Sequence, residues 1–122
     1  MVEACLLPAG LRRFRAEDLV APPLLWPEVR ASLHQSVWRG DLPAVRALEA
    51  LDRLSSSAIA SRAPAGLGGE AWRLADEFGW AKTYDAEYVA LAQLLRCRLV
   101  TLDAALRRST ARLGFVVSPT EL

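Results

Sequence analysis

The sequence predicts an α/β domain in which helices cover both faces of a short, mostly parallel sheet. Two observations support this prediction. Short apolar runs alternate with longer segments whose apolar residues recur at helical spacing. Acidic residues then stand where strands or loops lead into helices. Because 122 residues are enough to bury a core, we expect one domain over residues 1–122.

Residues 83–103 show this alternation most clearly. Thr83 is placed to cap a helix whose first turn contains Asp85, where the helix dipole favours an ionised carboxylate. The expected buried stripe of this helix consists of Tyr84, Tyr88, Leu91, Ala92 and Leu95. The apolar run over residues 99–102 predicts a strand of a parallel sheet, and Asp103 follows it as the cap of the next helix.

The first half of the chain predicts short elements separated by prolines and glycines. A short helix over residues 2–7 precedes a polar connection over residues 11–18 and a minimal strand over residues 19–21. A helix begins between Pro23 and Pro27 and ends at Gly40, with Val29, Leu33 and Val37 as its buried stripe. The next helix, capped by Asp41, is expected to bury Val45, Leu48, Leu51 and Leu54, and residues 57–62 are compatible with an edge strand.

The second half continues the same pattern. Residues 65–69 are glycine-rich but lack the lysine and spacing of a phosphate-binding loop, so we expect a linker. Helices are predicted over residues 71–78 and 104–113, each ended by a glycine. Residues 115–117 form a final short strand.

Composition and charge restrict the function only weakly. The chain is 52% hydrophobic and 24% charged with a net charge of +1, which is ordinary for a soluble domain. Its two cysteines, Cys5 and Cys97, are too far apart for a metal motif and fit a reducing compartment. Neither a membrane-length apolar run nor a signal-peptide layout is present. We therefore expect a cytoplasmic protein with no membrane partner.

Three carboxylates are the candidate site. Glu28, Asp85 and Asp103 each lie near the start of a helix that follows a strand or loop. Each residue alone is explained by capping or by the helix dipole. Parallel sheets, however, bind ligands beyond the carboxyl ends of their strands, which brings such residues to one edge. Three carboxylates there repel one another unless a cation relieves them, and oxygen ligands suit a hard divalent cation.

Basic residues follow the last of these carboxylates. Arg107, Arg108 and Arg112 share the helix after Asp103. They are interpreted as a solvated helix face, or as groups beside a metal that hold a phosphate backbone.

Three segments resemble PIN domains, and specifically the VapC-type toxin ribonucleases of bacterial toxin–antitoxin pairs. They are LVAPPLLWPEV at residues 19–29, TYDAEYVALA at residues 83–92 and LVTLD at residues 99–103. The resemblance implies a three-layer α/β/α domain that holds Mg²⁺ or Mn²⁺ through acidic side chains and cuts RNA by metal-assisted hydrolysis. It also implies a small cognate antitoxin and a homodimer as partners.

Carried over by position, the resemblance makes Glu28, Asp85 and Asp103 catalytic and metal-binding residues. Thr101 matches a hydroxyl that often accompanies the last aspartate, and Arg107 and Arg108 are the expected substrate-binding cations. The family's first acidic residue, an aspartate ending an N-terminal strand, has no match, because residues 2–7 align with the helix after that strand. We therefore expect the first strand to be missing from residues 1–122, through an upstream start of translation or decay of the gene.

Two functions follow from this pattern. The first is a metal-dependent endoribonuclease toxin. The second is a catalytically inactive PIN-like module that retains only an antitoxin-binding or dimerisation surface. A phosphoacceptor receiver domain is disfavoured, because Lys82 precedes a helix instead of following a late strand.

Overall fold

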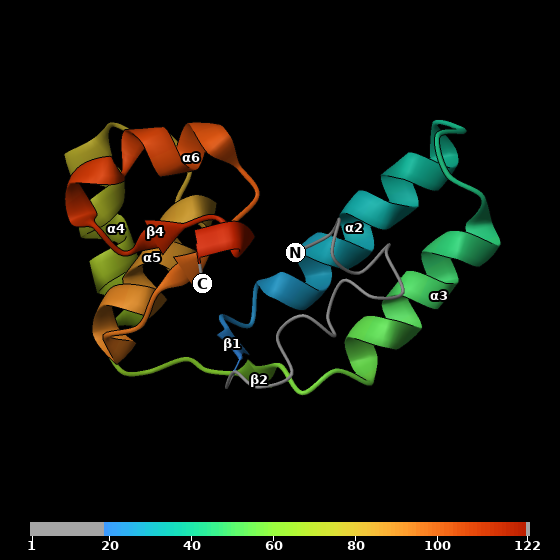
Figure 1. Cartoon of the computed structure of the whole chain (residues 1–122), viewed down its shortest axis with the longest axis horizontal. Helices are drawn as coiled ribbons and strands as arrows, with labels where there is room; N and C mark the ends of the chain where they lie inside the picture. Colours follow the sequence, from blue (N-terminus) through green and yellow to red (C-terminus); the bar gives the residue numbers. More distant parts are fainter. Residues whose placement is uncertain (1–18, 122) are drawn as a thin grey trace. The chain divides into compact units, whose positions relative to one another are not determined.

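The computed structural model describes residues 19–121, so the expected helix over residues 2–7 and connection over residues 11–18 lie outside the described residues. The chain divides into two compact units, which we call the N-terminal unit (residues 1–61) and the C-terminal unit (residues 62–122), and each is described by itself (Figure 1). A single domain over the whole chain stays a prediction. None of the helices in residues 19–121 has the length and apolar character that crossing a membrane requires.

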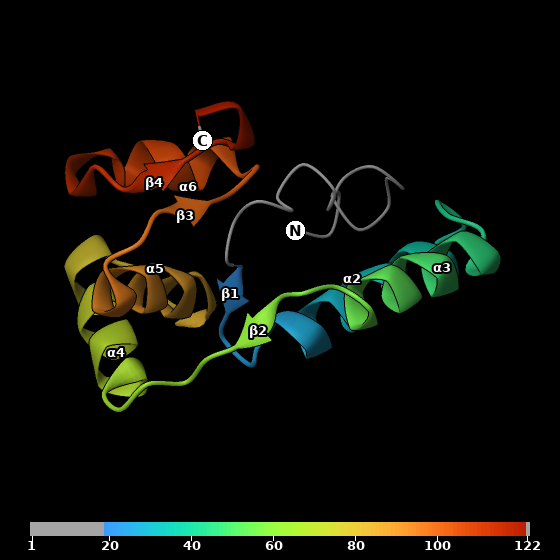
Figure 2. The same ribbon diagram turned by 60° about the horizontal axis from the view of Figure 1, so that its bottom comes forward.

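The N-terminal unit pairs two very short strands and packs two helices together. Strand β1 (Val20–Ala21) runs parallel to β2 (Ala60–Ser61), with Val20 opposite Ala60. Helices α2 (Leu25–Trp38) and α3 (Ala44–Ser55) lie side by side in both views (Figures 1 and 2). The strand at residues 19–21, the start of α2 between two prolines and the strand within residues 57–62 are therefore confirmed.

The buried face of α2 agrees with the sequence, whereas that of α3 does not. Leu25, Val29 and Leu33 of α2 are buried, and Val37 is half-buried. In α3 the buried residues are Ala47, Ala50 and Leu54. Val45 and Leu48, expected in the core, are 62% and 65% exposed.

The physical reason is the helical period. Residues three apart on a helix are offset by about 60° at each step, so four residues at this spacing cannot share one face. The exposed fraction accordingly falls along the expected stripe, from exposed Val45 and Leu48 through half-buried Leu51 to buried Leu54. The predicted Asp41 cap is also wrong, because Pro43 occupies the N-cap and no side chain caps α3.

The C-terminal unit contains two long helices followed by a βαβ segment. Its elements are α4 (Leu67–Phe78), α5 (Tyr84–Leu95), β3 (Leu99–Val100), α6 (Ala104–Ser109), the 3-10 helix η2 (Ala111–Leu113), β4 (Val116–Val117) and the 3-10 helix η3 (Pro119–Glu121). Strands β3 and β4 are parallel, with Leu99 opposite Val116. Helices α4 and α5 pack against each other (Figures 1 and 2). The prediction of a helix-rich α/β chain with short parallel strands is confirmed.

Two expectations for this unit are wrong in detail. The glycine-rich linker is shorter than expected, because Gly68 and Gly69 belong to the first turn of α4 and buried Leu67 starts its apolar face. The helix over residues 104–113 is interrupted at Thr110, a buried residue whose hydroxyl donates to the Leu106 carbonyl at 2.7 Å. Such back-bonding offers the carbonyl a second donor and favours a bend in the helix.

Helix α5 buries Leu91 and Ala92 of the expected stripe, together with residues beside it. Its buried residues are Ala86, Val89, Ala90, Leu91 and Ala92. Tyr84, placed in the core by its spacing, is 51% exposed. The three buried alanines are small, and α5 packs against α4.

Arg96 ends α5 in the left-handed conformation, with φ of 54°. An L side chain at such a position costs about 1 kcal/mol, which glycine avoids. We expect Arg96→Gly to raise the free energy of unfolding by about 1 kcal/mol in urea denaturation. Among residues 19–121 it is the one non-glycine residue with positive φ, so Arg98→Gly is the matched control and should not stabilise. A loss of stability in Arg96→Gly would contradict this reading.

Candidate functional site

Two of the three predicted carboxylates lie near each other in the C-terminal unit. Asp85 is in the first turn of α5, and Asp103 directly precedes α6, just beyond β3. Helix α5 packs against β3. The two carboxylates are close enough for the negative charge of Asp103 to contribute to a raised pKa of Asp85.

The electrostatic state of Asp85 is unfavourable for an ionised group. Loss of hydration, with a further contribution from the charge of Asp103, raises the pKa of the Asp85 carboxyl above its usual value. The side chain keeps access to solvent, so the neighbouring protein atoms reduce the hydration of the carboxylate without enclosing it. A like-charge pair of this kind is stabilised by a cation.

Asp103 is held in a defined orientation. Its Oδ1 accepts a hydrogen bond from the Leu106 N–H at 3.1 Å, so the predicted helix cap is confirmed. Its own N–H donates to the Thr101 Oγ1 at 3.1 Å. The second carboxylate oxygen has no hydrogen-bond or ion-pair partner within residues 19–121, and it is available for a ligand.

Thr101 connects the strand end to its neighbours. Its N–H donates to the Val117 carbonyl at 3.0 Å, which continues the β3–β4 pairing. Its carbonyl accepts from the Arg107 Nη1 at 2.8 Å. Arg107 thus ties α6 to the end of β3, a role that residue spacing did not predict, because the acceptor is a backbone carbonyl. Arg108 is exposed on α6, and substrate binding by either arginine stays a prediction.

Glu28 belongs to the N-terminal unit, where it lies in the first turn of α2 and is half-buried. That Glu28 joins Asp85 and Asp103 in one site stays a prediction. Within residues 19–121, no three His, Cys, Asp or Glu side chains are grouped to hold a metal ion. The C-terminal unit therefore supplies a pair of carboxylates.

The expected cap of α5 is wrong, because Thr83 precedes the helix but its side chain makes no capping hydrogen bond. Asp85 consequently stands in the first turn beside uncapped backbone N–H groups. The partial positive charge of this helix end favours a carboxylate there.

Comparison with known proteins identifies the family of this chain. The sequence pattern of the PIN domain family matches residues 9–111. The VapC ribonuclease Mb0985 of Mycobacterium bovis is 34% identical over 105 residues, which cover 84% of this chain and 80% of that protein. Ribonuclease VapC9 of Mycobacterium tuberculosis matches with the same identity and coverage. The chain therefore belongs to the PIN domain family and, within it, to the VapC type.

Proposed function

We propose that this chain is a divalent-cation-dependent endoribonuclease, the toxin component of a toxin–antitoxin pair, acting in the cytoplasm. The observation that carries the proposal is the pair formed by Asp85 and Asp103, two carboxylates whose mutual repulsion and reduced hydration favour a bound cation. Similarity to VapC ribonucleases supports RNA as the substrate.

The donor set fits Mg²⁺ or Mn²⁺. Mg²⁺ is commonly bound by one or two carboxylates together with waters and substrate phosphates. Asp85 and Asp103 provide two carboxylates. The oxygen of Asp103 that accepts no hydrogen bond from Leu106 is available as a ligand. A role for Glu28 as a further carboxylate stays a prediction from the family resemblance.

The residues around the pair have distinct tasks. A cation held there supplies activation of water and neutralisation of charge at the scissile phosphate. The Leu106 N–H and the Thr101 hydroxyl fix Asp103 so that its carboxylate is already oriented. Arg108, exposed on the same helix as Arg107, is placed to contact an RNA phosphate.

A second candidate function is a PIN-like module that binds partners without catalysis. It is favoured by the large apolar side chains that α2 and α3 expose, with Trp38 83% exposed in addition to Val45 and Leu48. Exposed tryptophan and clustered apolar residues are typical of protein interfaces. Both candidates share a small antitoxin and a second copy of the chain as partners.

A measurement of metal binding distinguishes a metal site from carboxylates that only cap helices. We expect calorimetric titration with Mn²⁺ to show that Asp85→Asn and Asp103→Asn each weaken binding at least about tenfold, or about 1.4 kcal/mol. Asparagine also caps helices, so Asp103→Asn keeps the hydrogen bond to the Leu106 N–H. Asp76→Asn, an exposed carboxylate on α4, is the control.

The same proteins test catalysis. Wild type should cleave RNA with Mg²⁺ or Mn²⁺ and lose cleavage in chelator, whereas the two site variants should not cleave. Unchanged Mn²⁺ affinity in both variants would reduce the aspartates to structural residues. Mn²⁺ binding without any RNA cleavage would favour the non-catalytic module.

The raised pKa of Asp85 predicts a pH-dependent stability. A carboxyl whose pKa rises on folding binds protons more readily in the folded chain, so its unfavourable contribution is full above the folded pKa and fades as pH falls through it. We expect metal-free Asp85→Asn to melt at a higher temperature than wild type at pH 7. The difference should shrink toward acidic pH, whereas high salt should reduce only the smaller part that comes from the charge of Asp103. A difference that is independent of pH would refute this explanation.

The antitoxin is expected to place an arginine against the carboxylate pair, because a guanidinium forms strong bonds with carboxylates. Co-expression with the product of the neighbouring small reading frame should give a complex that co-purifies. The double variant Asp85→Asn/Asp103→Asn should release the partner at lower salt than wild type. Separate migration of the wild-type proteins at low salt would remove the support for a toxin–antitoxin pair.

A further inference from the structure

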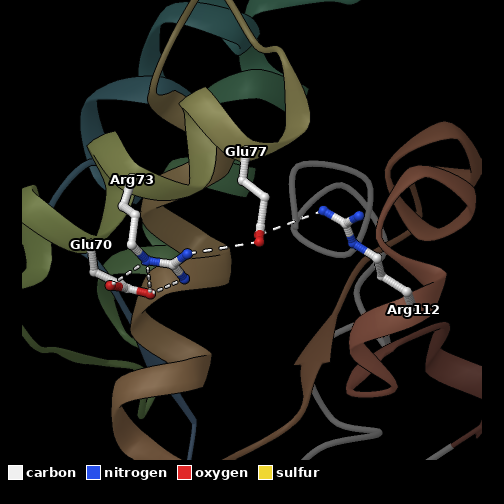
Figure 3. Close-up of polar contacts among 4 residues, drawn as sticks. All are labelled: Glu70, Arg73, Glu77 and Arg112. Carbon is white, nitrogen blue, oxygen red and sulfur yellow. Dashed lines mark hydrogen bonds and ion pairs between the residues drawn. The ribbon is translucent and has the colours of Figure 1, made fainter.

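Arg112 links the segment that follows Asp103 to the helix pair that carries Asp85. Its Nη2 lies 3.6 Å from the Glu77 Oε2, an ion pair between η2 and α4 (Figure 3). The same guanidinium lies over the ring of Phe78, with Cζ 4.4 Å from the ring centroid. Phe78 in turn stacks on Trp80, at 5.0 Å between ring centroids. Two independent contacts therefore converge on one side chain.

A second arginine in the same network acts only locally. Arg73 Nη2 lies 2.6 Å from Glu70 Oε1, and Arg73 Nη1 lies 3.8 Å from Glu77 Oε1 (Figure 3). All three residues belong to α4. Arg73 therefore reinforces one helix, whereas Arg112 joins two separate elements.

The contacts of Arg112 complete a chain of connected elements between Asp103 and Asp85. From Asp103 the chain runs through α6 into η2, which contains Arg112. Glu77 and Phe78, which Arg112 contacts, belong to α4. Helix α4 packs against α5, whose first turn contains Asp85. The Arg112 contact therefore connects the segment that follows Asp103 to the helix that packs against α5.

Two arginine contacts hold the segment that follows Asp103. Arg107 holds the start of α6 to the Thr101 carbonyl, and Arg112 holds the far end of the segment to α4. We propose that Arg112 is a positioning residue that keeps Asp103 at the distance from Asp85 needed for a shared cation, an inference that rests on the proposed metal site.

The chemistry of arginine suits both contacts. Its planar guanidinium stacks on an aromatic ring and pairs with a carboxylate at the same time, whereas lysine keeps the charge but not the planar stacking surface. The ion pair is solvent-exposed and the Phe78 ring is half-buried, and each contact is individually weak. Their loss should therefore alter geometry at the site without unfolding the chain.

The test compares Arg112→Ala, Arg112→Lys and the matched control Arg73→Ala in the full chain. Under conditions where circular dichroism shows each variant to be folded, calorimetry measures Mn²⁺ affinity. We expect Arg112→Ala to bind about three- to tenfold more weakly, as the loss of one exposed cation–π contact and one exposed ion pair allows. Arg73→Ala should match wild type, and Arg112→Lys should lie between wild type and Arg112→Ala.

A metal-free measurement separates this inference from the proposed function. In ¹H–¹⁵N spectra of the apo chain, the Leu106 amide, which donates to Asp103, should shift in Arg112→Ala but not in Arg73→Ala. If wild type binds Mn²⁺ and Arg112→Ala binds it equally well, the positioning role is wrong. If wild type binds no Mn²⁺, the proposed metal site is wrong, and the Leu106 amide signal then tests the positioning role alone. A shift confined to Arg112→Ala supports positioning of Asp103, and an unchanged signal overturns it.

Discussion

The repulsion between Asp85 and Asp103 is the constraint on which the candidate site depends. One carboxylate comes from the first turn of α5 and the other from the end of β3, and reduced hydration adds to the cost of ionising Asp85. A folded chain keeps such a pair only where surrounding contacts hold it in place. Strain of this kind is typical of functional sites, where stability is given up for pre-organisation.

Those surrounding contacts are mostly backbone groups and a few arginines. Asp103 is oriented by the Leu106 N–H and by the hydroxyl of Thr101, which is itself anchored to β4. Arg107 bonds the carbonyl of Thr101 and so spans the turn that presents Asp103. Close packing of small residues in α5 against α4 completes the support. The orientation of Asp103 therefore depends on secondary-structure elements and hydrogen bonds of 2.8–3.1 Å.

Large apolar side chains are exposed in both units. The N-terminal unit buries a core of Leu25, Val29 and Leu33, yet α2 and α3 leave large apolar side chains in solvent. The C-terminal unit also exposes such side chains, among them Trp72 at 67%. Removing apolar groups from water is favourable, so exposed groups of this kind are typical of protein interfaces.

The sequence by itself determined the order of the elements, the parallel character of the short strands, the family and the cap at Asp103. These depend on local signals: apolar period, proline and glycine positions, and motifs contiguous in the chain. It misjudged the buried face of α3, part of the buried face of α5 and the start of α4, and it did not predict the hydrogen bond from Arg107 to the Thr101 carbonyl. Each of these was decided by a partner distant in sequence, namely the helix that selects which face packs or the strand-end carbonyl that accepts the guanidinium. Only tertiary structure brings such partners together, because side-chain spacing along one element carries no information about the atoms that it meets.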